Sequence, residues 1–209
     1  MATYAATSPR LHLQTLSEEL HLHDLHLINS NPQATFWSTK KVATDIETTR
    51  AYIRTSLPTE EQPWNGRWAI LLRQTPELPK EGKLRMIGII GLPREQEIGY
   101  KLHPDFWGKG FMTEALLLFI QMWWSMESRL KYDRLLAGAD SENKASQRVL
   151  EKAGFKKGEF KRGFYARATL GGRKGDMQFY YLERPKGLNG EVELGRKSEK
   201  EIIFGVKDC

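Results

Sequence analysis

The segment best suited to chemistry runs from Trp107 to Glu114 and carries two glycines, Gly108 and Gly110, just before a long apolar stretch. Glycine lets the backbone adopt positive φ and approach a ligand closely. The apolar stretch is typical of a buried helix, and a helix N-terminus offers unpaired N–H groups and a partial positive charge. Together these features predict a site for a pyrophosphate group.

The spacing around these glycines narrows the choice of ligand. A loop that binds nucleoside triphosphates for hydrolysis needs a further glycine where His103 stands. A dinucleotide fingerprint needs one where Thr113 stands, at the first strand-to-helix junction, whereas this turn follows several strands of antiparallel type. Triphosphate hydrolysis and nicotinamide or flavin binding are therefore disfavoured.

Composition predicts one folded domain. The 209 residues are 40% apolar and 11% aromatic, with a net charge of +6. Cys209 is the only cysteine, so neither a disulfide nor a paired-cysteine metal site can form within the chain. The longest apolar stretch, Ala115–Ile120, is too short to cross a bilayer. We expect no membrane partner and a cytoplasmic location, with nuclear access not excluded.

Periodicity predicts alternating strands and helices. Short β-rich runs bounded by Gly, Pro or charge indicate strands at 10–16, 67–73, 85–92, 97–103, 134–139 and 177–184. Apolar residues at helical spacing indicate helices at 17–28, 41–55, 105–130 and 141–155. Composition shifts after Pro185, so we place the domain at 8–187 and a charged tail at 188–209.

Three further signals have plain structural interpretations. The basic stretch 156–174 is expected to be a solvated surface loop, with binding of phosphate or an acidic partner as the alternative. Only His23 and His26 share a helical face, too few ligands for a metal, so no metal site is expected. Trp123 and Trp124 are expected in the core rather than in base stacking.

The motifs together resemble the GNAT superfamily of acyl-CoA-dependent N-acetyltransferases. The segment EIGYKLHPDFWGKGFMTEAL is similar to the branch of ribosomal-protein N-terminal acetyltransferases of the RimJ and RimL type, where Trp-Gly-Lys-Gly replaces the usual Gln/Arg start. The segment ENKASQRVLEKAGF resembles the Asn-x-x-Ser helix of that branch. The resemblance covers roughly Pro9 to Pro185. It implies an α/β (α+β) GNAT fold whose mixed, mostly antiparallel sheet splays after the fourth strand, with helices on both faces.

The resemblance also implies which residues bind acetyl-CoA. Main-chain groups of Leu102 and His103 would bond the pantetheine arm, and Asn143 would bond it as well. Ser146 would lie near the thiol. The main-chain N–H groups of one continuous loop would hold the pyrophosphate, namely Gly108, Lys109, Gly110, Phe111, Met112 and Thr113.

Two residues are candidates for catalysis on the same grounds. Glu97 occupies the strand position where some family members keep a glutamate that acts through water as general base, and an ammonium must lose a proton before it attacks a thioester. An ordinary charged strand residue is the equally weighted alternative. Leu150 stands where many members place a Tyr general acid, which shifts the acid role to Ser146, to Tyr165 or to solvent. Met112 replaces the usual Gly or Ala and could narrow the phosphate turn.

These observations predict an enzyme that moves an acetyl group directly to a primary amine of a protein N-terminus or a small molecule. At pH 7 an α-amine of pKa about 7.8 is ~14% neutral and a lysine only ~0.04%, which favours an α-amine. One alternative is a GNAT-shaped binding module that uses the basic stretch 156–174, and another is a small-molecule or antibiotic acetyltransferase. Nucleic acid is not the expected partner, and a monomer and a homodimer both remain open.

Overall fold

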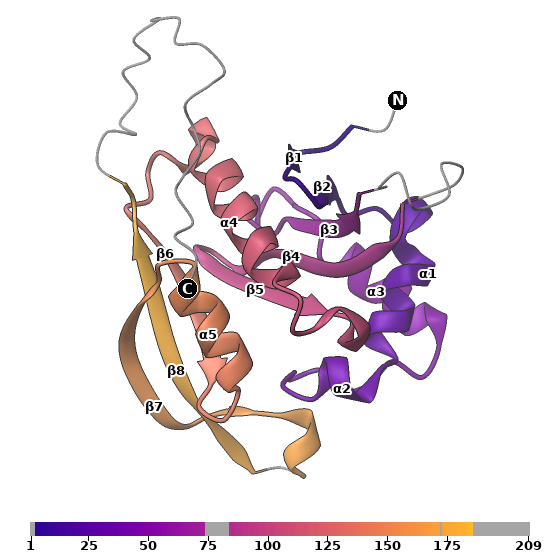
Figure 1. Ribbon diagram of the computed structural model, residues 1–209. Helices are drawn as coiled ribbons and strands as arrows, with labels where there is room; N and C mark the ends of the chain where they lie inside the picture. The colour runs from indigo at the N-terminus through magenta and orange to yellow at the C-terminus, as the bar shows by residue number, and fades with distance from the viewer. Residues whose placement is uncertain (1–2, 74–83, 172, 186–209) are drawn as a thin grey trace, which may run out of the picture.

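The computed structural model describes residues 3–73, 84–171 and 173–185, and its centre is one eight-stranded sheet (Figure 1). The strands lie in the order β1-β2-β3-β4-β5-β6-β8-β7. They are β1 Ala6–Thr7, β2 Leu11–Thr15, β3 Arg67–Leu72, β4 Met86–Arg94, β5 Glu97–Leu102, β6 Arg134–Asp140, β7 Lys156–Ala166 and β8 Lys174–Glu183. The predicted tail 188–209 lies outside the described residues, as does most of the turn between β3 and β4.

Five α-helices within the described ranges cover the two faces of the sheet. They are α1 Glu18–Asn29, α2 Pro32–Thr35, α3 Ile46–Arg54, α4 Phe111–Trp124 and α5 Lys144–Lys152. Helices α4 and α5 lie on one face, and α1 and α3 on the other (Figure 1). Each face has its own apolar core. Trp123 and Trp124 of α4 are buried in the larger core, as predicted.

Four of these helices begin at a polar side chain that accepts a hydrogen bond from the first turn. Ser17 caps α1, Asn31 caps α2, Asp45 caps α3 and Asn143 caps α5. Helix α4 differs, because its N-cap is Gly110 and no side chain bonds its first turn. The N-terminal N–H groups of α4 therefore stay available to a ligand.

The predicted helix over 105–130 is too long at both ends. Gly108 and Gly110 adopt φ of 73° and 77°, a left-handed conformation that an α-helix cannot contain, so α4 starts only at Phe111. Short 3-10 turns, Pro104–Phe106 and Glu127–Arg129, occupy part of the remaining length.

The prediction of a surface loop over 156–174 is wrong for its first eleven residues. These residues form β7, the edge strand that pairs with β8. Lysine side chains on an exposed edge discourage pairing with other chains, which explains the basic composition. Three lysines of this strand each form an ion pair with a glutamate, namely Lys156, Lys157 and Lys161. Part of the positive charge of the stretch is therefore neutralised within the protein.

The feature that positions the site is the junction of β5 and β6. These two strands form the parallel pair of the sheet, and their pairing covers only Glu97↔Leu136 and Ile98↔Ala137. Beyond Ile98 the two strands diverge. The predicted fold, a mostly antiparallel sheet that splays after EIGYKLH, is confirmed. No helix in the described part of the chain is long and apolar enough to span a membrane.

Candidate active site

A cavity of about 500 Å³ lies beside β5, where this strand diverges from β6, and residues of β5, α5 and the loop before α4 line it. Tyr100 and Lys101 of β5 both line it, although successive strand residues point to opposite faces of a sheet. The Tyr100 hydroxyl reaches Ser146 on α5, and the Lys101 ammonium reaches Asn29 on α1. The cavity therefore receives side chains that point to both faces of the sheet.

One end of the cavity lies at the uncapped N-terminus of α4. Gly108, Gly110, Phe111, Met112 and Thr113 line this end. A Cβ on Gly108 would contact nothing within 4 Å, so the loop leaves open space beside its backbone. This end of the cavity suits a phosphate group, because it combines free N–H groups, the positive end of the helix dipole and open space.

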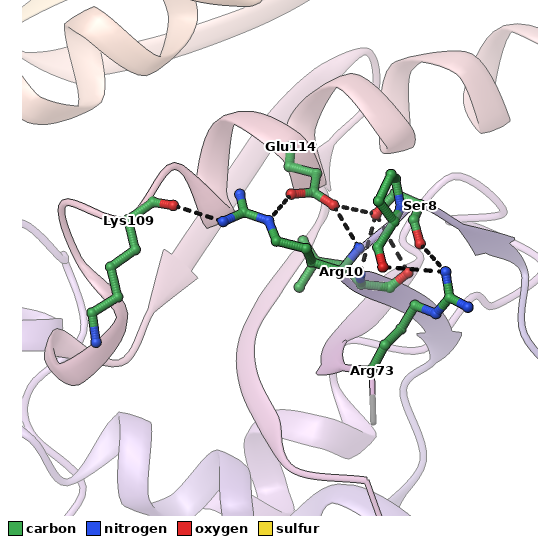
Figure 2. A network of polar contacts seen from close by, with 7 residues as sticks. Ser8, Arg10, Arg73, Lys109 and Glu114 are labelled. Atoms are coloured by element: carbon green, nitrogen blue, oxygen red, sulfur yellow. Dashed lines mark hydrogen bonds and ion pairs between the residues drawn. The ribbon is translucent and has the colours of Figure 1, made fainter. Parts of the chain in front are cut away.

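A polar network holds this loop in place from the first hairpin of the chain (Figure 2). The Arg10 guanidinium donates to the Lys109 carbonyl oxygen at 3.1 Å and to a Glu114 carboxylate oxygen at 2.6 Å. The Ser8 hydroxyl donates to the other Glu114 oxygen at 2.7 Å. Arg73 in turn donates to the Ser8 carbonyl oxygen at 2.7 Å. We call Ser8, Arg10 and Glu114 the loop clamp.

The clamp also resolves a charge conflict at the phosphate end. Glu114 lies in the first turn of α4, where its carboxylate would repel a bound phosphate. Partial burial alone would raise the pKa of Glu114, but hydrogen bonds from Ser8 and Arg10 outweigh it and hold the pKa below its usual value. Arg10 thus neutralises Glu114 and fixes the loop with the same guanidinium.

We expect Arg10→Met to weaken acetyl-CoA binding about tenfold, because one charge-assisted hydrogen bond to the loop region is worth roughly 1.5–3 kcal/mol and Glu114 loses its counter-charge. Titration calorimetry measures the effect. Arg73→Met is the matched control, because the Arg73 guanidinium donates to the Ser8 and Pro9 carbonyls of the same hairpin and, among the described residues, forms no bond to Glu114 or to the loop. Equal affinities for the two variants would contradict the role of the clamp.

Polar groups from β5 and α5 meet in the middle of the cavity. The Tyr100 and Ser146 hydroxyl oxygens lie 2.9 Å apart. Burial raises the pKa of Tyr100, so this phenol keeps its proton. Asn143 uses its Oδ1 to accept from the Ser146 N–H at 3.0 Å, which leaves its Nδ2 as a donor at the cavity wall.

The main-chain groups of Leu102 and His103, at the end of β5, face opposite sides of the strand. The His103 N–H donates to the Ile87 carbonyl of β4 at 2.9 Å. Successive residues of an antiparallel strand direct their main-chain groups to opposite sides, so the groups of Leu102 face away from β4, toward the opening beside β6. The Leu102 carbonyl accepts from the Trp107 indole at 2.9 Å. Leu102 lines the cavity and His103 does not.

The other end of the cavity lies at α2. Gln33, Ala34, Trp37 and Ser38 line it. The segment after β7 closes over it from outside, because the Arg167 guanidinium stacks 4.6 Å from the Trp37 ring centroid and the Ala168 N–H donates to the Ser38 carbonyl at 3.1 Å.

Of the remaining predicted site residues, Glu97 and Lys109 do not line the cavity. Glu97 begins β5 and bonds the Arg94 guanidinium at 2.5 Å. It lies three residues before Tyr100, about 10 Å along the strand. Lys109 is exposed, and its ammonium donates to the Asp105 carbonyl.

Met112 turns its side chain into the core under α4, so it adds little bulk to the phosphate loop.

A catalytic role for Glu97 stays a prediction, and Glu97→Gln tests it. Because Glu97 pairs with Arg94 outside the cavity wall, we expect turnover within about threefold of the wild-type rate, well short of the 10²–10⁴-fold that general-base catalysis contributes. Steady-state kinetics across pH 6–9 measure it. A loss of about a hundredfold, together with loss of the acidic limb of the pH profile, would show that Glu97 acts through water after all.

Tyr165, the other candidate acid, does not line this cavity. Its hydroxyl donates to the buried Asp140 carboxylate at 2.5 Å. Burial and this bond to Asp140 raise the pKa of Tyr165. Arg167 stands 3.8 Å from the same carboxylate. Tyr165 thus belongs to a buried cluster beside the cavity.

Sequence reasoning missed Tyr100, Lys101, Arg148 and Lys152, all of which line the cavity. The first two had a usable signal. They follow Glu97 in a strand expected to border the opening, so strand alternation places one on each side of it. Arg148 and Lys152 lie four residues apart on α5, one helical turn, and so share a face.

Comparison with known proteins agrees with this geometry. Residues 10–156 match the family of the acetyltransferase (GNAT) domain. An uncharacterized N-acetyltransferase of Bacillus subtilis (strain 168), YoaA, is 29% identical over 164 residues, which cover 75% of this chain and 84% of that protein. The uncharacterized N-acetyltransferase p20 of Bacillus licheniformis is 26% identical, over 69% of this chain and 84% of that protein.

Solved structures share the fold. A GNAT acetyltransferase from Bacillus anthracis superposes with a TM-score of 0.67 at 19% identity, over 85% of this chain and 97% of that one. RimL, a ribosomal L7/L12 α-N-protein acetyltransferase in complex with coenzyme A, gives 0.67 at 19%, over 87% and 98%. MccE, a microcin C7 self-immunity acetyltransferase in complex with acetyl-CoA and AMP, gives 0.65 at 18%, over 85% and 94%. The chain belongs to the GNAT family of N-acetyltransferases.

Proposed function

We propose that this enzyme uses acetyl-CoA as donor and transfers the acetyl group directly to the α-amine of a protein N-terminus or of a small molecule. The observation that carries the proposal is the continuous cavity, which joins an uncapped helix N-terminus on one side of the sheet to the α2 pocket on the other. The RimL and MccE structures, which hold coenzyme A and acetyl-CoA, support this donor.

The donor side of the cavity fits this cofactor group by group. The N–H groups of Phe111, Met112 and Thr113 would hold the pyrophosphate, and the cations of Arg148 and Lys152 would neutralise phosphate charge. The Asn143 amide and the Leu102 main chain would bond the pantetheine arm. Bound in this way, the thioester supplies an activated acetyl group.

The chain's own residues supply proton transfer on the leaving side. Ser146 would donate its hydroxyl proton to the departing sulfur and take a proton from Tyr100, whose hydroxyl oxygen is 2.9 Å away, while Tyr100 regains the proton that the acceptor amine releases through solvent and so ends protonated. Both groups are neutral donors at pH 7. We propose Ser146 as the catalytic acid and Tyr100 as its proton relay.

The composition of the cavity wall supports an α-amine as acceptor. Among the described residues, no carboxylate or imidazole lines the cavity. An acceptor must therefore arrive largely neutral or lose its proton to solvent. An α-amine of pKa about 7.8 meets this need at pH 7 far better than a lysine of pKa about 10.4.

The test measures acetyl transfer to matched peptides. The release of free thiol gives the rate, and mass spectrometry identifies the acetylated group. A peptide with a free N-terminus and no lysine should gain one acetyl group. A second peptide has the same sequence except for one internal lysine, and its N-terminus is blocked. Its acetylation should be at least about tenfold slower. Faster acetylation of the lysine peptide would overturn the assignment of an α-amine, and absence of transfer to every amine would overturn the proposed function.

A further inference from the structure

Lys101 places a positive charge at the acceptor end of the cavity. Its ammonium donates to the Asn29 side-chain oxygen at 2.9 Å, at the end of α1 just before α2. The side chain is half-buried and lines the cavity. The ammonium therefore faces the space between β5 and α2, on the opposite side of the sheet from Tyr100 and Ser146.

The elements packed around Lys101 offer no counter-charge. Helix α1 presents the neutral amide of Asn29, α2 lines the same space with Gln33 and Ala34, and β4 places Ile89 beside Lys101 in the sheet. Within the described residues Lys101 forms no ion pair. Burial alone lowers its pKa to about 8, and no neighbouring charge contributes to the shift.

A half-buried cation without an anion is unfavourable in the free protein, because desolvation costs free energy that only a partner charge offsets. At the acceptor end, the substrate can bring that partner. We propose that Lys101 binds a carboxylate of the acceptor, so that the amine acetylated by this enzyme carries a carboxylate group nearby. This inference rests on the proposed function and adds the chemical class of its acceptor.

Two sources of acceptor have this chemistry. One is a free amino acid, whose carboxylate lies on the same carbon as its amine. The other is a peptide N-terminus with an acidic first residue. Trp37 adds an aromatic wall at the same end of the cavity. The proposal requires only that the carboxylate reaches Lys101 while the amine points through the opening toward the thioester.

The experiment compares matched acceptors that differ in one charge. The first pair is an amino acid and its amide, and the second is a peptide that begins with Glu and its counterpart that begins with Gln. At pH 7 we expect wild-type kcat/KM to favour the carboxylate member of one pair by about 10- to 100-fold, the range for a charge-assisted hydrogen bond. The pair that shows the preference identifies the source.

Lys101→Met tests whether Lys101 is the cause. Methionine has a side chain of similar length without the charge. In this variant the ratio of kcat/KM between the carboxylate acceptor and its neutral counterpart should fall to nearly 1. Lys40→Met is the matched control, because Lys40 is exposed and does not line the cavity, and it should keep the wild-type preference. Thermal unfolding and the acetyl-CoA dissociation constant, measured on both variants, show whether they are folded and bind the donor.

The pH dependence gives a readout that needs no variant. Lys101 is charged below its pKa of about 8, so the preference should be full at pH 7 and decline above pH 8. A bound carboxylate favours the charged form and raises this pKa. Binding of the acetylated product to the coenzyme A complex near pH 8.5 should therefore take up protons, which calorimetry in two buffers of different ionisation enthalpy detects.

Equal kcat/KM for both members of each pair would overturn the carboxylate proposal while leaving the proposed function in place. So would a preference that survives in Lys101→Met. If the wild-type enzyme acetylates no member of either pair and no other amine, the proposal falls together with the function on which it rests.

Discussion

Replacing Gly110 with valine should raise the dissociation constant of acetyl-CoA by at least about a hundredfold, because two charge-assisted hydrogen bonds from main-chain N–H groups are worth roughly 3–6 kcal/mol. Gly110 has φ of 77° and is the N-cap of α4. A β-branched residue strongly disfavours this conformation, so the turn must rearrange. The N–H groups of α4 would then no longer converge on the phosphates.

The control separates backbone strain from loss of the site. Gly171 also has positive φ, 56°, and a Cβ there would contact nothing within 4 Å. Gly171→Val should therefore lower stability by a similar amount, about 1–2 kcal/mol, yet keep the wild-type affinity for acetyl-CoA. Titration calorimetry measures the acetyl-CoA dissociation constant of both folded variants and so separates the two effects. Unchanged affinity in Gly110→Val would refute the assignment of the phosphate end.

Removing the hydroxyl of Ser146 should have the second largest effect, on turnover rather than on binding. We expect Ser146→Ala to lower kcat about a hundredfold, within the range for loss of a general acid, while the acetyl-CoA dissociation constant changes less than about threefold. The reason is that the thiolate would leave without a proton. Pre-steady-state measurement of thiol release checks it.

Tyr100→Phe tests the relay. If Ser146 and Tyr100 act in one chain, as their 2.9 Å contact indicates, the double variant should be little slower than Ser146→Ala alone, because residues that act as a unit are not additive. Fully additive effects would mean that Tyr100 acts on its own. A kcat for Ser146→Ala close to wild type would move the acid role to solvent.

A local signal was sufficient to predict the glycine turn before α4, whereas the other donor-site residues were expected only from the family resemblance. The glycines at 108 and 110 imply a backbone conformation that few other residues adopt. Positions fixed by backbone chemistry can be found without knowing their neighbours. Gly108 and Gly110 line the cavity, and so do Leu102, Asn143 and Ser146, which were expected from the resemblance to the GNAT family rather than from a local signal.

The acceptor side and the loop clamp could not be predicted in this way, because both depend on contacts between distant segments. The approach of Lys101 to Asn29 joins residues 72 positions apart, and the clamp between Arg10 and Glu114 spans 104. Neither pairing has a local sequence signature. The edge strand β7 was missed because both of its faces are largely exposed, so its sequence lacks the apolar alternation of a half-buried strand.

Thermal unfolding with and without acetyl-CoA tests the central claim most directly, that the cavity between β5 and β6 binds this donor. A ligand at one hundred times its dissociation constant adds about 2.7 kcal/mol to the folded state. For a domain of this size the midpoint should then rise by about 5–11 °C. A rise that Gly110→Val abolishes and Gly171→Val retains is the predicted result. An unchanged midpoint of the wild-type protein at millimolar acetyl-CoA would contradict the account.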